Sequence, residues 1–98
     1  MPFDSLPLTN DVVQQLEEMY SLLSKGWIQR SFHSKDGYCL IGAAMHVRLG
    51  RHALADVLGY KQTASIVRFN DRPGRTQSEV LARLRKAIKK EREKILLG

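Results

Sequence analysis

The sequence predicts a mainly α-helical fold, a compact bundle of about four helices that forms a single helical domain over residues 1–98. Apolar residues recur at helical spacing at positions 12–23 and again at positions 80–95. A third stretch, residues 39–49, is apolar on nearly every side, as in a buried central helix. Hydrophobic content of 43% and charged content of 27% are close to globular averages, so the chain can form one core.

The chain is predicted to begin with a loose lead-in over residues 1–8, which contains two prolines. A helix over about residues 11–25 follows, with one apolar stripe and polar residues outside it. Three residues can cap the N-terminus of this helix: Thr9, Asn10 and Asp11. Gly26 is predicted to end the helix in the left-handed conformation.

The segment at residues 27–38 breaks the helical spacing, and its Asp-Gly pair is a turn signal, so we expect a short hairpin or an irregular segment there. In the apolar helix that follows, Gly42 and Ala43 carry little or no side chain. They therefore predict that another element, most simply a helix, approaches closely. Gly50 is predicted to end this helix.

Two shorter helical segments are predicted next, at residues 53–58, closed by Gly59, and at residues 63–69. Residues 70–75, Asn-Asp-Arg-Pro-Gly-Arg, consist of turn formers and predict a polar turn. A Thr-Gln-Ser-Glu capping box at residues 76–79 then begins the last helix. This helix has one apolar stripe: Val80, Leu81, Leu84, Ala87, Ile88 and Ile95.

The positive charge of the chain is concentrated in its last third. The formal net charge is +6. Residues 1–60 contain five Lys/Arg and six Asp/Glu, whereas residues 61–98 contain eleven and four. Such asymmetry favours a polyanionic partner, nucleic acid or a ribonucleoprotein, and the alternative is a solvated, solubilising helix face. The candidate nucleic-acid-binding residues all lie on the last helix: Arg83, Arg85, Lys86, Lys89, Lys90, Arg92 and Lys94.

No catalytic, cofactor or metal motif stands out. Neither glycine-rich phosphate-binding pattern occurs, and the carboxylates are scattered. The single cysteine, Cys39, lies in an apolar run, where a small buried side chain is the ordinary role. His33, His46 and His52 lack the paired spacing of structural zinc sites. We therefore expect a non-enzymatic protein without cofactor or metal. One cysteine and no apolar run of about 20 residues predict a cytoplasmic protein without a membrane span.

Two other kinds of binding stay open. The chain could be a protein-binding inhibitor or adaptor of a host complex, with aromatic anchors and a basic turn at its interface. The candidate partner-binding residues are Trp27, Phe32, Tyr60, Arg68, Arg72 and Arg75. Residues 54–60 also resemble the beginning of a helix-turn-helix regulator of DNA, with a second helix through Ile66 and Arg68. Ser65 occupies the position at which that motif expects an apolar residue.

The chain also resembles an uncharacterised family of small bacterial and phage proteins. The resemblance rests on W-x-Q from Trp27, C-x-x-G-A from Cys39 and N-D-x-P-x-R-T-x-x-E-V from Asn70, and it extends over about residues 20–90. Phe69 stands where that family often has Trp. The resemblance implies a bacterial or phage origin but no activity. By analogy with other small phage proteins, it suggests a host-binding role such as an anti-defence (anti-CRISPR-like) inhibitor.

Overall fold

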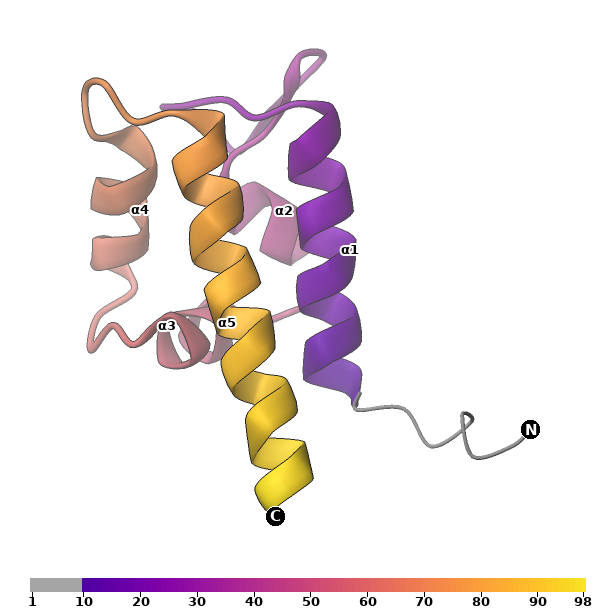
Figure 1. Cartoon of the computed structure of the whole chain (residues 1–98). Coiled ribbons are helices and arrows are strands. Elements are labelled where there is room, and N and C mark those ends of the chain that lie inside the picture. Colours follow the sequence, from indigo (N-terminus) through magenta and orange to yellow (C-terminus); the bar gives the residue numbers. More distant parts are fainter. Residues whose placement is uncertain (1–9) are drawn as a thin grey trace.

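The computed structural model describes residues 10–98, which form five helices and one short antiparallel hairpin (Figure 1). The mainly α fold is therefore confirmed. The predicted lead-in at residues 1–8 lies outside the described residues. The elements in chain order are α1 (Asp11–Lys25), β1 (His33–Ser34), β2 (Gly37–Tyr38), α2 (Leu40–His46), α3 (Arg51–Leu58), α4 (Ala64–Asp71) and α5 (Gln77–Leu97).

The two long helices, α1 and α5, lie side by side and form the frame of the molecule (Figure 1). The short helix α2 packs against α1, α3 and α4 and is buried over most of its length. Helix α3 also packs against α5. One apolar core joins these helices, and its largest fully buried side chains are Leu16, Met19, Leu23, Leu40, Leu54, Leu58, Ile66 and Leu84. None of the helices within residues 10–98 is long and apolar enough to cross a membrane.

Both long helices begin with the side-chain caps that the sequence predicts. The Asn10 side chain accepts a hydrogen bond from the Val13 N–H at 2.9 Å and so caps α1. Thr76 and Glu79 form the complete capping box at the start of α5. The pKa of the Glu79 carboxyl lies below its ordinary value, chiefly because the Thr76 backbone N–H donates to it.

The two glycines around the hairpin are required by close backbone contacts. Gly26 has a φ of −177°, so the prediction of a left-handed end to α1 is wrong. Segment 26–28 instead pairs with Tyr38, and a Cβ at Gly26 would lie 2.2 Å from the Asp36 carbonyl oxygen. The predicted close approach at Gly42 is confirmed, but the segment that approaches is the loop before β1 and not another helix. A Cβ there would lie 1.8 Å from the Phe32 carbonyl oxygen.

Two predicted boundaries are wrong for identifiable reasons. Helix α2 ends at His46, and Gly50 precedes α3 as its N-cap. The left-handed residue between these helices is Arg48, with a φ of 65°. The predicted turn at residues 70–75 is also too long, because Asn70 and Asp71 belong to the last turn of α4. Their side chains bind the segment after α1, which keeps them helical.

We predict that Gly42→Ala lowers the free energy of unfolding by about 2 kcal/mol or more, because the added methyl group overlaps the Phe32 carbonyl. The better helix propensity of alanine, about 1 kcal/mol, cannot offset this overlap. Gly50→Ala is the matched control, since no heavy atom of another residue within residues 10–98 lies within 4 Å of its Cβ position. Urea unfolding of both variants measures the difference. Equal stability would show that the loop is not packed against α2.

Candidate functional site

The side chain of Asn70 joins three parts of the chain. It is only 2% exposed. Its Oδ1 accepts hydrogen bonds from Trp27 Nε1 at 2.8 Å and from the Leu40 backbone N–H at 3.0 Å. Its Nδ2 donates to the Ile28 carbonyl at 3.1 Å and to Asp71 Oδ1 at 2.8 Å. All four hydrogen-bonding positions of the amide are therefore used, and they fix α4 against the segment after α1 and the start of α2.

The backbone around this amide is held by two further side chains, Gln29 and Asp71. Gln29 Nε2 donates to the carbonyls of Asn70 and Arg72, each at 3.0 Å. The Arg30 N–H donates to Asp71 Oδ1 at 2.9 Å, and Arg30 itself has a φ of 66°. Arg30 is thus a non-glycine residue in the left-handed region, at a place where α4 determines the conformation of the loop.

The six candidate partner-binding residues differ in how far their side chains are exposed and in whether they make contacts within the fold. Trp27 uses its only donor within the fold, and Arg75 Nε donates to the Phe69 carbonyl at 2.8 Å while its guanidinium lies 3.9 Å from the Phe69 ring centroid. Tyr60 is half-buried below Arg83. The other three are exposed: Phe32, Arg68 and Arg72.

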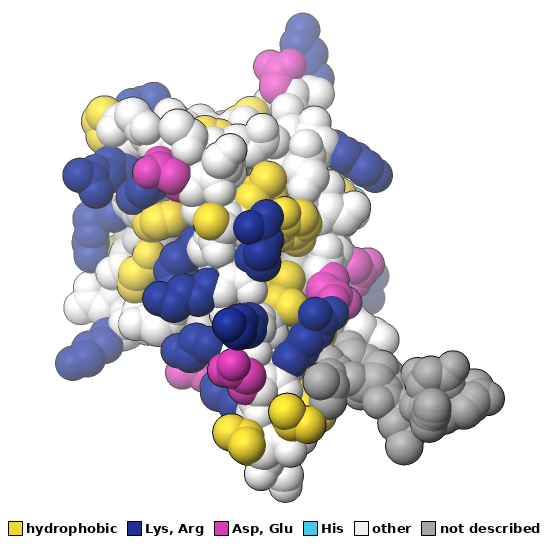
Figure 2. All heavy atoms as spheres, in the orientation of Figure 1, with side chains coloured by type: hydrophobic (Ala, Val, Ile, Leu, Met, Phe, Trp, Pro, Cys, Tyr) yellow, Lys and Arg dark blue, Asp and Glu magenta, His cyan; other side chains and the backbone are white. Residues whose placement is uncertain are grey.

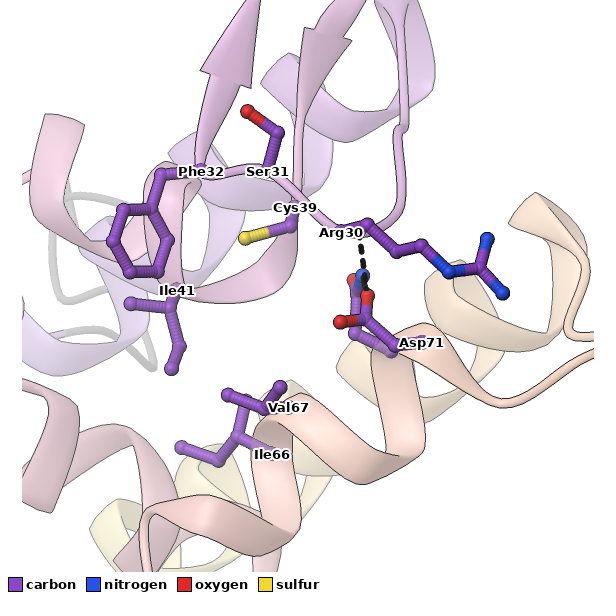
Figure 3. A pocket seen from close by; sticks show the side chains of 9 residues that line it. Arg30, Ser31, Phe32, Cys39, Ile41, Ile66, Val67 and Asp71 are labelled. Atoms are coloured by element: carbon purple, nitrogen blue, oxygen red, sulfur yellow. Dashed lines mark hydrogen bonds between the residues drawn. The ribbon is translucent and has the colours of Figure 1, made fainter.

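A half-open, mostly apolar pocket of about 420 Å³ lies beside this cluster (Figure 3). It lies between the loop at residues 30–32, the start of α2 and helix α4. No motif in the sequence indicates this pocket. The available signal is the adjacent apolar pair Ile66 and Val67 on α4, because adjacent helical residues point about 100° apart, so one can face the core while the other borders the surface. The lining residues are Arg30, Ser31, Phe32, Cys39, Ile41, Ile66, Val67, Asn70 and Asp71.

Cys39 lies on the wall of this pocket and is 7% exposed. Its Sγ accepts a hydrogen bond from the Gly42 N–H at 3.3 Å and caps α2. Burial raises the pKa of the thiol above its ordinary value, so the thiolate needed for nucleophilic attack is disfavoured near neutral pH. Of the histidines, His33 stacks on Tyr38 and His46 Nδ1 lies 3.3 Å from the Tyr38 hydroxyl. Residues 10–98 contain no group of three or more His, Cys, Asp or Glu arranged to hold a metal ion.

Four of the seven candidate cations on α5 have a partner within residues 10–98, and three of these four join α5 to another helix. Arg83 donates to the Leu58 carbonyl. Arg85 donates to the Tyr20 hydroxyl at 2.6 Å and lies over its ring, and Arg92 forms an ion pair with Glu17 of α1. Lys94 pairs with Glu91 at 2.9 Å, and this contact raises the pKa of Lys94.

The other three cations, Lys86, Lys89 and Lys90, are exposed, and none makes a hydrogen bond or ion pair within residues 10–98. Their spacing of three and four residues places them on one solvent-facing side of α5. Figure 2 shows Lys and Arg side chains gathered along the face where α5 lies in Figure 1. The sequence identifies the basic helix, but only the structure separates these three lysines from the four cations that have a partner.

The helix-turn-helix interpretation depends on α3 and α4. Gly59 ends α3 in the left-handed conformation, with a φ of 82°. The connection then runs over residues 59–63, longer than the roughly three to four residues of that motif. On α4, Ile66 faces the core and Arg68 Nη2 donates to Ser65 Oγ at 3.0 Å. Groove reading by α4 stays a prediction without a geometric feature in its favour.

Comparison with family models identifies the kinship of the chain. The model described as a family of unknown function, DUF6197, matches residues 7–90, most of the chain. The chain therefore belongs to this family, which confirms the resemblance to an uncharacterised family, whereas the individual motif positions stay a prediction. Comparison with curated proteins gave no match. Comparison with solved structures also gave none.

We predict that Asn70→Ala costs about 3 kcal/mol or more of stability. The change leaves the Leu40 N–H and the Trp27 indole without their acceptor in a buried setting, at about 1–3 kcal/mol each. Asn10→Ala is the matched control, because it removes an exposed cap worth about 1 kcal/mol. Urea unfolding, followed by fluorescence of the single tryptophan, compares the two. A cost for Asn70→Ala no larger than that of the control would contradict the structural role of the amide.

We also predict that Cys39 is alkylated slowly in the folded protein. At about pH 8, iodoacetamide should react at least about fivefold more slowly with folded than with urea-unfolded protein, because burial limits access and raises the pKa. The rate in the folded protein should keep rising at pH values where that in the unfolded protein has levelled off. Mass spectrometry over time measures both rates. Fast alkylation at neutral pH would contradict a protonated, buried thiol.

Proposed function

We propose that this member of DUF6197 binds the phosphate backbone of nucleic acid through the exposed face of α5. The observation that carries the proposal is a set of three exposed lysines, Lys86, Lys89 and Lys90, that make no hydrogen bond or ion pair within residues 10–98. The ammonium group of a lysine without such a partner remains available to phosphates. A net charge of +6 supports the same partner, since it attracts a polyanion from a distance.

The geometry of α5 favours contact with the backbone over reading of bases. The 21 residues of α5 extend over about 30 Å, and the opposite face of the helix packs against α1 and α3. A helix held in this way offers one long edge to a surface. Lysine carries a compact charge on a flexible stem, which suits phosphates at variable positions. We therefore expect binding with weak sequence preference.

The anchored arginines extend this surface at its edge. Arg85 and Arg92 contact α1 through Tyr20 and Glu17, yet both remain exposed. Each guanidinium has five N–H donors, so donors remain for a phosphate beside the contact with α1. These arginines are poor sites for a functional test, because changing them also weakens the packing of α5 on α1.

A protein-binding adaptor is the second candidate, and the exposed ring of Phe32 supports it. Phe32 is 51% exposed beside the pocket, as an interface anchor would be. The other two candidate anchors, Trp27 and Tyr60, are half-buried and packed within the fold. One exposed aromatic residue supports protein binding less strongly than three exposed lysines on one side of α5 support nucleic-acid binding.

We predict that replacing Lys86, Lys89 and Lys90 together by glutamine weakens binding to a mixed-sequence DNA or RNA duplex. It should lower the slope of log affinity against log salt concentration by about three units if each lysine contacts one phosphate. Fluorescence anisotropy over a salt series measures this slope. Circular dichroism checks that the variant remains helical.

The matched control replaces Lys25, Lys35 and Lys61 by glutamine. These lysines are also exposed, so the control has the same net charge as the α5 variant but leaves α5 intact. It should bind with a nearly unchanged slope. Equal loss in both variants would reduce the effect to overall charge, and no loss in the α5 variant would identify this face as a solubilising surface.

A further inference from the structure

We infer that the pocket between the loop at residues 30–32 and α4 is a binding site for a small aromatic molecule that carries an N–H donor. Its volume of about 420 Å³ falls within the range of small-molecule sites, roughly 300–1,000 Å³. Its walls come from three segments that the Asn70 amide and its neighbours fix to one another. The pocket is thus held open by the fold without a ligand, which lowers the cost of binding.

The apolar lining favours an aromatic ring. Ile41 and Ile66 are almost fully buried below the pocket, and β-branched side chains of this kind are stiff. Phe32 and Val67 border the opening and remain 51% and 41% exposed (Figure 3). A flat ring would cover both side chains and could stack on the ring of Phe32.

The carboxylate of Asp71 selects an N–H donor on that ring. Its Oδ1 accepts from the Arg30 N–H and from Asn70 Nδ2, at 2.9 and 2.8 Å. No group within residues 10–98 donates to the second oxygen, and none of the buried side-chain N or O atoms there lacks a partner, so this oxygen remains accessible. Figure 3 shows this carboxylate at one end of the pocket, while the Arg30 guanidinium points away.

The pocket therefore combines an apolar slot with one fixed acceptor. Two hydrogen bonds hold the Asp71 carboxylate before any ligand arrives, so its free oxygen has a defined direction. A ring without a donor could fill the slot but would desolvate this oxygen without replacing its hydrogen bond to water. Indole and benzofuran test the distinction, because they share size and shape and differ in N–H against ring oxygen.

We predict that indole binds with a dissociation constant on the order of 1 mM or tighter. Benzofuran should bind about five- to tenfold more weakly. Chemical shifts in ¹⁵N spectra give both constants and locate the site. Protection of Cys39 from alkylation is an independent readout, because it is the single cysteine of the chain and lies on the pocket wall. The inference would be overturned if neither indole nor benzofuran binds at about 10 mM, or if the two bind with equal affinity.

Three variants make the assignment specific to this pocket. Val67→Trp fills the slot from a partly exposed position on α4, so it should abolish binding. Lys61→Trp introduces the same ring at an exposed position that does not line the pocket, so it should keep binding. Asp71→Asn keeps an oxygen for the Arg30 N–H but places an amide N–H₂ where the free oxygen was. The preference for indole over benzofuran should then disappear. Melting temperatures confirm that each variant is folded. Indole binding that persists in Val67→Trp would place the probe elsewhere and overturn the assignment.

Two further measurements distinguish a small-molecule site from a peptide-docking site and from an effect of α5. N-acetyltryptophanamide presents the same ring on a peptide backbone. If it binds and free indole does not, the pocket docks a peptide side chain and the small-molecule assignment is wrong. The variant with Lys86, Lys89 and Lys90 replaced by glutamine should bind indole normally, because none of these lysines lines the pocket. Loss of indole binding in that folded variant would contradict a site independent of α5.

Discussion

The arrangement of the chain around its pocket depends on one buried amide. A polar side chain removed from water is costly unless its hydrogen bonds are remade, and Asn70 remakes all four with partners from three segments. Because each of these bonds has a short range of favourable distances and angles, the amide sets where α2 begins and how the segment after α1 crosses α4. A purely apolar contact at this place would permit small sliding movements, whereas a four-way hydrogen-bonded contact does not.

Because this contact needs several polar partners, some side chains that resemble functional groups have a structural role. Trp27 and Gln29 fix the loop, and Arg75 covers Phe69, so their polar groups are already engaged. The same division runs through α5, where three arginines bind neighbouring helices. The two proposed sites use groups that have no partner within residues 10–98, namely three lysines on α5 and one oxygen of Asp71. Charge alone does not make that distinction; the contacts of each charged group do.

The sequence predicts what local chemistry determines and fails where distant partners decide. Apolar spacing and side-chain caps predict α1 and α5 because both signals lie within one helix. Asn70 and Asp71 are misread as a turn, because Asn and Asp next to Pro-Gly are typical of turns and the partners that hold them helical lie 30–43 residues away. The prediction for Gly26 is wrong for the same reason, since the atom that requires a glycine there belongs to Asp36, in the turn between β1 and β2. The pocket escapes prediction because its walls come from segments far apart in sequence.

The two proposed sites share no residue, and they differ in how precisely the fold must position their groups. Phosphate contacts by lysine tolerate movement, because the attraction falls off slowly with distance and the side chains are flexible. A slot with one acceptor tolerates little, because its selectivity depends on where the free oxygen of Asp71 points. The Arg30 N–H donates to the other oxygen of the same carboxylate and so fixes where the free oxygen points. The same hydrogen bond holds the backbone of Arg30 in its left-handed conformation. Asn70 lines the pocket and does not belong to α5, so weakening its contacts should impair the pocket well before it impairs the lysine face of α5.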